Sequence, residues 1–372
     1  MSVELKNEIL AYKKFDNFDF EECKNQNFDE LNDELIEKID NLVSLSNSIS
    51  SPLLKELKPT IALSIKWKFD FLAKTGESPF NLIEDFDYWI NILRMMDLLS
   101  THEWFTKTEN KLEDDVWGRT KEAFNFMWPR NTAEKNYDIS KQMVEARLEQ
   151  IINMMGIGEN ELKKLTIVDS GCGPGRYTDV MSKYGPKKII GVDSGIDIIN
   201  TNLDRFKDRS NIEMIHGSCD SLPVKDESAD FVISAGVLHH LPNPIEELVK
   251  EHARVTRKNG FFFIFIAGIG GLELKIWEFL RLFLNDIPVS LLYETFEGKI
   301  SPLRLQGLLD HGYGEYQQTS REDLESWLGN EFEVVTRVPG IDGLDVTEEI
   351  FEKDKYFTYR FGSGNLRYLC KK

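Results

Sequence analysis

Cysteine is scarce in this chain of 372 residues, and the four that occur are widely scattered. Cys23, Cys172, Cys219 and Cys370 show no C-x-x-C spacing, which argues against a zinc site and against a disulfide framework. We therefore expect reduced thiols in a cytoplasmic protein, and no metal site.

An excess of positive charge is also missing. Lys and Arg number 45 against 63 Asp and Glu, so the formal net charge is −18. This balance argues against a nucleic acid as the main partner, because a phosphate backbone is bound chiefly by basic side chains. The longest apolar run, Phe261 to Leu272, is too short to span a bilayer. The first ten residues lack the basic start and apolar run of a secretory signal. We predict no membrane span.

What the chain does contain is enough apolar material for a large core. Hydrophobic residues make up 41% and aromatic residues 11%, and the length suits two domains. Residues 1–155 show helical apolar spacing and hold five of the seven tryptophans. These aromatics either fill a helical core or wall a substrate pocket. From residue 156 the pattern changes to strands alternating with helices, so we expect an α/β domain over 156–372 with a helical insertion at about 270–320.

The stretch from Leu165 to Thr178 is the most informative part of the sequence. A short apolar strand ends at Asp169, and glycines follow at 171, 173 and 175 before a helix-compatible segment. Glycine lets the backbone adopt positive φ and lets a ligand approach the main chain closely. The helix start behind the glycines offers unpaired N–H groups. The stretch therefore predicts a ligand-binding loop.

A second apolar strand ends in a carboxylate at Asp193, which suits the hydroxyls of a ribose. The glycine spacing is G-x-G-x-G, whereas a dinucleotide site has G-x-G-x-x-G. Asp169 precedes the first glycine by two residues; it would repel a pyrophosphate but suits a ligand with an ammonium or sulfonium charge. Both features favour a sulfonium nucleoside over a dinucleotide.

This pattern resembles the class I S-adenosylmethionine-dependent methyltransferases. The resemblance covers residues 160–267 well and the first 125 residues hardly at all. It implies a seven-stranded, mostly parallel, Rossmann-like sheet beside the N-terminal all-helical domain. It also implies methyl transfer from S-adenosyl-L-methionine to a small molecule, with S-adenosyl-L-homocysteine as product. A binding module without activity and a nucleotide-dependent oxidoreductase are the alternatives.

The family usually carries an acid and a small residue after the third strand, where they contact adenine. Here Ser218 and Cys219 take these places, and Asp220 competes for the adenine contact. Upstream of the glycines, a predicted loop offers an Arg and a Tyr that either hold a carboxylate or are merely solvated. The cofactor residues implied are Asp169, Gly171, Gly173, Gly175, Asp193, Ser194, Ser218, Cys219, Arg130 and Tyr137.

Catalytic candidates follow the fourth strand and lie in the insertion. His239 and His240 belong to an L-H-H-L segment like that of small-molecule methyltransferases; each is either a general base or a packing residue. Tyr313 lies in a polar, glycine-containing stretch that we predict to be a loop. Together with Asp310, His311 and Tyr316 it forms a second set of candidates, in a stretch that is either part of the site or an ordinary surface loop.

The apolar stretch Leu272 to Tyr293, broken at Pro288, leaves three interpretations open: a lid, an oligomer contact or a membrane-surface helix. A homo-oligomer is therefore compatible with the sequence. The aromatic helical cap suggests an extended or apolar acceptor such as a lipid, quinone or secondary metabolite, methylated at O, N, S or C. The last two strands are expected at 332–338 and 356–370.

Overall fold

The computed structural model describes residues 28–48, 52–100, 116–130, 134–284, 287–298, 300, 302–341 and 356–372. Cys23, which we expect to be reduced, lies outside these residues. Within them, no helix is both long and apolar enough to cross a membrane.

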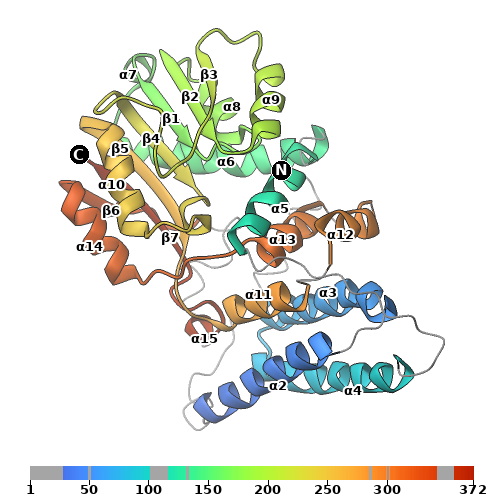
Figure 1. The fold of residues 1–372 in the computed structure, drawn as a ribbon. Coiled ribbons are helices and arrows are strands. Elements are labelled where there is room, and N and C mark those ends of the chain that lie inside the picture. Colours follow the sequence, from blue (N-terminus) through green and yellow to red (C-terminus); the bar gives the residue numbers. More distant parts are fainter. Residues whose placement is uncertain are drawn as a thin grey trace.

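One seven-stranded sheet organises the second half of the chain (Figure 1). Its strand order is β3-β2-β1-β4-β5-β7-β6; the first five pair in parallel, and β7 runs antiparallel to both of its neighbours. The predicted seven-stranded, mostly parallel sheet is thus confirmed. The strands are β1 (Thr166–Ser170), β2 (Lys188–Asp193), β3 (Ile212–His216), β4 (Ala229–Ala235), β5 (Thr256–Ala267), β6 (Val334–Arg337) and β7 (Asn365–Lys371).

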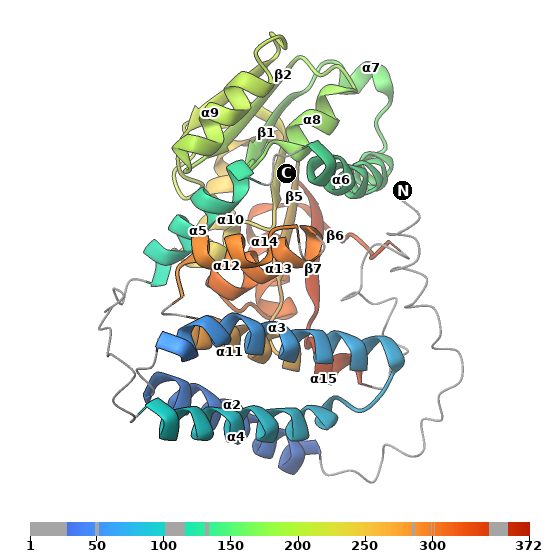
Figure 2. The ribbon, with the colours of Figure 1, turned by 90° about the vertical axis from the view of Figure 1, so that its right-hand side faces the viewer.

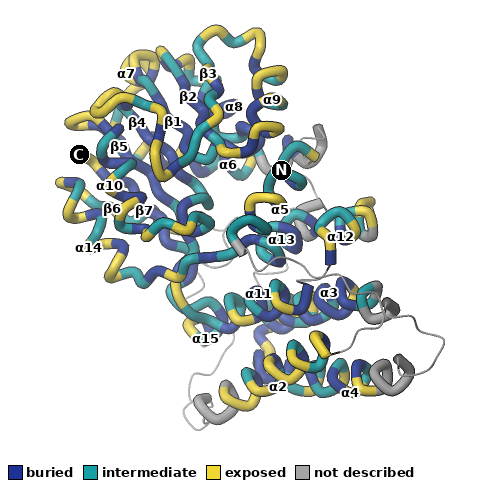
Figure 3. The backbone as a smooth tube through the Cα atoms, viewed as in Figure 1, coloured by how far each residue is buried: buried dark blue, intermediate teal, exposed yellow. Residues whose placement is uncertain are grey.

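Helices cover both faces of this sheet, which explains why its central strands are apolar throughout. Helices α10 (Ile245–Val255) and α14 (Arg321–Glu331) pack with Val168 and Phe262 in one buried cluster. Helices α6 (Glu134–Met155) and α8 (Arg176–Ser182) contribute to a second cluster on the other face. Figure 3 shows that the central strands β1, β2 and β4 are largely buried. The sheet edge that carries the loops is thereby fixed in place.

A separate helical body lies beyond the carboxyl ends of the strands (Figures 1 and 2). N-terminal helices and the insertion after β5 share one hydrophobic core there, so the insertion does not pack as a free-standing lid. The N-terminal helical region is confirmed, whereas the division into domains at residue 155 stays a prediction; α6 packs on the sheet. The helices of this body are α2 (Phe28–Ser48), α3 (Pro52–Thr75), α4 (Leu82–Ser100), α11 (Leu272–Phe283), α12 (Val289–Phe296), α13 (Pro302–Tyr313) and α15 (Phe357–Phe361).

Two local expectations were wrong. The stretch expected to be a loop at 310–316 is helical through Tyr313, because Leu305, Leu308 and Leu309 anchor α13 in the helical core. The stretch expected to be a strand from 356 is first the short helix α15, and β7 begins only at Asn365. A turn at Gly362, where φ is 58°, separates the helix from the strand.

Candidate functional site

The glycine loop joins β1 to α8 at the carboxyl edge of the sheet. Gly171, Gly173 and Gly175 all have positive φ, of 72°, 49° and 79°. The N–H groups of Gly171 and Cys172 donate to the carbonyl of Val192 at 2.8 and 3.0 Å, which ties the loop to β2. Gly173 is buried, yet a Cβ built on it would meet no atom within 4 Å. The loop therefore faces a space that a ligand can fill.

Asp193 ends β2 directly beside that space. One carboxylate oxygen accepts the N–H of Gly173 at 2.9 Å, and the other accepts the N–H of Gly195 at 2.9 Å. Burial raises the pKa of this carboxyl group, and the backbone N–H bonds oppose that effect. The two carboxylate oxygens have four lone pairs against the three backbone N–H groups of Gly173, Ser194 and Gly195, so the group can still accept a hydroxyl hydrogen. The chemistry of this pair of oxygens fits a ribose diol.

Asp169 is buried at the end of β1, and its side chain accepts hydrogen bonds from the helix that follows the loop. Its Oδ2 accepts the backbone N–H of Thr178 at 3.0 Å and the Thr178 hydroxyl at 2.7 Å, in the first turn of α8. Burial raises its pKa to about 6, although both Thr178 bonds oppose the shift. Its predicted place beside the cationic end of a cofactor stays a prediction.

The loops after β2 and β3 lie together, since the N–H of Gly217 donates to the carbonyl of Asp193 at 3.0 Å. Ser194 is exposed there and Ser218 is half-buried. Cys219 is buried, which raises its thiol pKa to about 12, and it hydrogen-bonds Ser170. Asp220 is exposed. The adenine contact predicted for Ser218 and Cys219 is compatible with these positions and stays a prediction.

Tyr137 lies on α6, not in the loop that the sequence predicts, and it supports the glycine loop. Its hydroxyl lies 3.3 Å from the carbonyl of Gly175 and 3.3 Å from Oδ2 of Asp179. Lys141 and Arg209 hold the same buried Asp179 carboxylate, and these ion pairs lower its pKa. A Tyr–carboxylate network thus braces the loop, and the predicted contact of Tyr137 with the cofactor itself stays a prediction.

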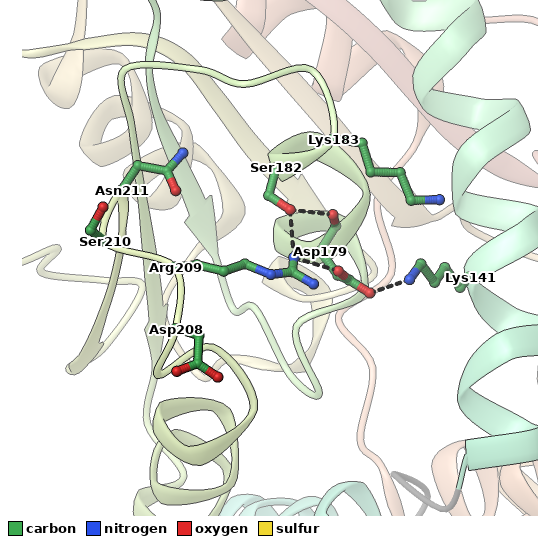
Figure 4. A pocket seen from close by; sticks show the side chains of 8 residues that line it. All are labelled: Lys141, Asp179, Ser182, Lys183, Asp208, Arg209, Ser210 and Asn211. Carbon is green, nitrogen blue, oxygen red and sulfur yellow. Dashed lines mark hydrogen bonds and ion pairs between the residues drawn. The ribbon is translucent and has the colours of Figure 1, made fainter.

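The outer side of this network forms a pocket of about 480 Å³ (Figure 4). Open α/β sheets bind ligands outside the carboxyl ends of their strands. This pocket includes the turn before β3, at the amino end of that strand, so it is not the cofactor site. It is lined by Lys141, Asp179, Ser182, Lys183, Asp208, Arg209, Ser210 and Asn211.

Helix α5 (Val116–Arg130) crosses the carboxyl edge of the sheet. A Cβ built on Gly195 would lie 2.5 Å from Oδ1 of Asn125. One turn away, the guanidinium of Arg176 stacks over the Trp128 ring at 5.0 Å. The helix thus reaches the loops after both β1 and β2.

Arg130 ends α5 and is exposed. It lies within a helix, not in the loop that the sequence predicts. Its guanidinium donates to the carbonyl of Phe126 at 2.9 Å and stacks on the Phe126 ring. The predicted carboxylate contact of Arg130 stays a prediction.

His239 and His240 form a short 3-10 turn after β4. Nδ1 of His239 accepts the N–H of Ala267 at 3.0 Å, so its proton is on Nε2. Nδ1 of His240 instead donates to the carbonyl of Glu315 at 2.7 Å, which leaves its Nε2 bare. Burial keeps the pKa of His239 well below its usual range and lowers that of His240 to about 3. Both rings are neutral.

The insertion completes the wall around these rings. The Tyr316 ring stacks on His239 at 4.9 Å and 17°, and it also contacts His240 and His311. Phe124, from α5, meets His240 edge-on at 4.8 Å. Asp310 lies 3.7 Å from Nε2 of His240. The structure thus brings together five of the predicted candidates: His239, His240, Asp310, His311 and Tyr316.

Tyr313 is the last residue of α13. Its hydroxyl donates to the carbonyl of Ile287 at 2.9 Å, and its ring packs against the helical core. Its predicted catalytic role stays a prediction.

Several residues of the site have no signal in the sequence. Asn202, on α9 (Ile196–Arg205), donates to the carbonyl of Gly173 at 2.7 Å and so fixes the loop from outside. Phe124 and Asn125 look like ordinary residues of an amphipathic helix, whereas Trp128 is one of the tryptophans for which a pocket wall is one of the two interpretations. Arg281, on α11, stacks over Tyr316 at 5.3 Å. Only the tertiary structure brings them to the sheet edge.

Comparison with known proteins agrees with this geometry. Residues 168–264 match the family model described as a methyltransferase domain. An uncharacterized methyltransferase of Schizosaccharomyces pombe is 34% identical over 95 residues, which are 26% of this chain and 36% of that protein. The malonyl-[acyl-carrier protein] O-methyltransferase of a Marinomonas species is 25% identical over 130 residues, 35% and 46% of the two chains. The demethylmenaquinone methyltransferase of Staphylococcus aureus is 26% identical over 129 residues, which are 34% of this chain and 53% of that protein.

The chain thus spans between about a third and about half of the length of these curated relatives. Among solved structures, geranyl diphosphate C-methyltransferase from Streptomyces coelicolor is 12% identical, with a TM-score of 0.40. That likeness covers 61% of this chain and 77% of the other.

Proposed function

Because residues 168–264 form a class I S-adenosylmethionine-dependent methyltransferase domain, we propose that the chain transfers a methyl group from this cofactor to a small, ring-bearing or apolar acceptor. The cofactor half of this proposal rests on the edge formed by β1 and β2. The acceptor half rests on the wall formed by α5, α13 and the loop after β4.

The observation that carries the proposal is the pairing of Asp193 with Gly173. The carboxylate is held in place by backbone N–H groups, and the glycine beside it is buried without anything in front of its Cα. Asp193 would accept the ribose hydroxyls, and the bend at Gly173 would leave room for the methionine part. Asn202 and Tyr137 would keep the loop in this conformation.

When bound, the cofactor supplies an electrophilic methyl group on a sulfonium. The chain has to align the acceptor and exclude water, which accounts for much of the rate in such a transfer. The wall offers neutral, stacked rings: His239, His240, Tyr316 and Phe124. A flat or apolar acceptor suits these rings better than a strongly charged one, since burial of an unpaired charge is unfavourable.

The names of the relatives do not decide the acceptor. One specifies malonyl-[acyl-carrier protein] and another demethylmenaquinone. The helical body that faces the site lies outside the matched residues 168–264. The acceptor is therefore inferred from the wall of this chain alone.

Calorimetry with S-adenosylhomocysteine tests the cofactor half. Replacement Asp193→Ala should weaken binding by at least tenfold, because hydrogen bonds to a charged group contribute about 1.5–3 kcal/mol each. Asp204→Ala is the matched control; its side chain is 82% exposed, and we expect no change. Equal affinities of wild type and Asp193→Ala would contradict the placement of this carboxylate.

Methyl-labelled cofactor and an organic-solvent extract of cells test the transfer itself. We expect label in a compound that partitions into the organic phase, and none with Asp193→Ala. No binding of S-adenosylhomocysteine by the wild type would instead support a binding module without activity. Binding of a nicotinamide cofactor in its place would support an oxidoreductase.

A further inference from the structure

The ring cluster at the acceptor wall contains one acidic side chain, Asp310 on α13. Its carboxylate is 22% exposed and lies 3.7 Å from Nε2 of His240. Within the described part of the chain, no Lys or Arg nitrogen lies within 4.0 Å of it. A carboxylate in such a place is poorly stabilised in its charged form.

The neighbouring imidazoles already have fixed proton positions. His239 accepts a backbone N–H at Nδ1, and His311 uses its Nδ1 to contact the Tyr316 hydroxyl. His240 differs because its Nδ1–H is donated to the Glu315 carbonyl, so its bare Nε2 faces Asp310. Of these imidazoles, His240 is thus the one whose free nitrogen faces a carboxyl group, that of Asp310.

Two elements bring charged groups to the pair. Arg176 at the start of α8 acts on Asp310 and opposes the effect of burial on its pKa. Arg281 on α11 acts on His240, and α5 presents the Phe124 and Trp128 rings. The effect of burial is larger than that of Arg176, so the pKa of Asp310 is raised to about 7. At neutral pH the group is therefore poised between its two forms.

We propose that Asp310 and His240 form one proton-accepting pair on the acceptor side of the site, and that the methylated atom of the acceptor accordingly carries a proton: a hydroxyl or an acidic C–H. This inference rests on the proposed function for its substrate class. The juxtaposition of the two side chains does not depend on it.

The new bond to the methyl carbon is formed by a lone pair of the hydroxyl oxygen or, for an acidic C–H, by the electron pair that the C–H bond leaves on carbon when its proton is removed. The pair of the C–S bond remains on sulfur. The proton of the acceptor atom passes to the Asp310 carboxylate, and the bare Nε2 of His240, 3.7 Å away, faces the acid that forms. Without a base, a hydroxyl would become a cationic ether during transfer, which a buried, neutral wall stabilises poorly. The pair removes that charge.

The first test needs neither cofactor nor acceptor. The carboxyl titration of protein labelled with ¹³C-aspartate should show one group with a midpoint near pH 7. This signal should vanish in Asp310→Asn and persist in the control Asp204→Asn. In His240→Gln its midpoint should move downward, because the bare nitrogen that favours the protonated acid is gone, whereas replacing exposed His216 by Gln should leave it unchanged.

The second test uses the binding and transfer assays. Asp310→Asn should bind S-adenosylhomocysteine within twofold of wild type, yet lower kcat by about 100-fold. The limb of the pH–kcat profile near pH 7 should disappear with it. Asp310 titrating near pH 4, or unmoved by His240→Gln, would overturn the pair. Failure of the wild type to bind S-adenosylhomocysteine would sink the proposed function but leave the titration result standing.

Discussion

The two halves of the site are built by different means. On the cofactor side, the site is formed mainly by backbone N–H groups and carboxylates, and most of them come from one stretch between Asp169 and Asp193. On the acceptor side, side-chain rings form the wall, and they come from α5, α11, α13, the β4 loop and Tyr316. The first half needs a particular local backbone. The second needs the whole helical body in place.

This difference determines which substitutions each half of the site can tolerate. A backbone cradle tolerates few changes, since glycine alone adopts its φ angles without strain. A wall of rings tolerates exchange of side chains as long as volume and polarity are kept. The cofactor side therefore suits a fixed ligand, and the acceptor side suits a ligand that differs among relatives.

The largest predicted contrast is in the pH dependence of stability. His311 has a pKa near 3 in the fold against 6.5 unfolded, so its contribution is present above pH 6.5 and is lost as pH falls. Asp169 has a pKa near 6 against 3.8, so its contribution is present below pH 3.8 and is lost as pH rises through 6. Acidification thus lowers the contribution of His311, in the acceptor wall, to the free energy of unfolding. It raises the contribution of Asp169, at the cofactor edge.

Two variants separate these effects in urea unfolding between pH 6 and pH 4. His311→Gln should make the free energy of unfolding less pH-dependent by about 1.4 kcal/mol per pH unit. Asp169→Asn should make it more pH-dependent by about the same amount. Parallel curves for both variants and wild type would show that neither group is perturbed in the fold.

The next prediction compares two glycines of one loop. Gly175→Ala would place a methyl group 2.7 Å from the Phe206 ring at a φ of 79°, so the free energy of unfolding should fall by about 2–4 kcal/mol. The methyl group of Gly173→Ala would meet no atom within 4 Å, so this substitution should lower the free energy of unfolding by only about 1–2 kcal/mol.

Binding of S-adenosylhomocysteine should rank these two glycine variants differently. The methyl of Gly173→Ala occupies the ligand space, so affinity should fall by at least tenfold in a protein that remains folded. Unchanged binding by Gly173→Ala would mean that the open space in front of this residue belongs to no cofactor.

The same contrast explains what the sequence predicts well. The strands, the glycine turn and the carboxylate at Asp193 are contiguous, and the spacing of glycine and acid reports directly on backbone geometry. The pattern 310–316 misleads, because Gly312, Gly314 and the polar side chains favour a loop. Leu305 and Leu309 override that preference by packing α13 into the helical core.

The acceptor wall is harder still to predict. Tyr316 meets His239 across 77 positions of sequence, and their ring stacking has no local signature. Phe124 reaches His240 only because α5 crosses the sheet edge. The L-H-H-L motif marks the right place but not the proton positions. Those follow from the Ala267 N–H and the Glu315 carbonyl, which only the fold brings there.

The smallest predicted effect decides which half Tyr137 belongs to. Its hydroxyl contacts the Gly175 carbonyl from behind the loop, so Tyr137→Phe should lower the free energy of unfolding by about 1 kcal/mol. S-adenosylhomocysteine binding should change less than twofold, because the loop N–H groups and Asp193 remain. Tyr88→Phe, at a tyrosine that is 59% exposed, is the control and should alter neither quantity. A tenfold loss of affinity with unchanged stability would instead place Tyr137 in contact with the cofactor. The cofactor half would then depend on a side chain from outside the sheet, as the acceptor half does.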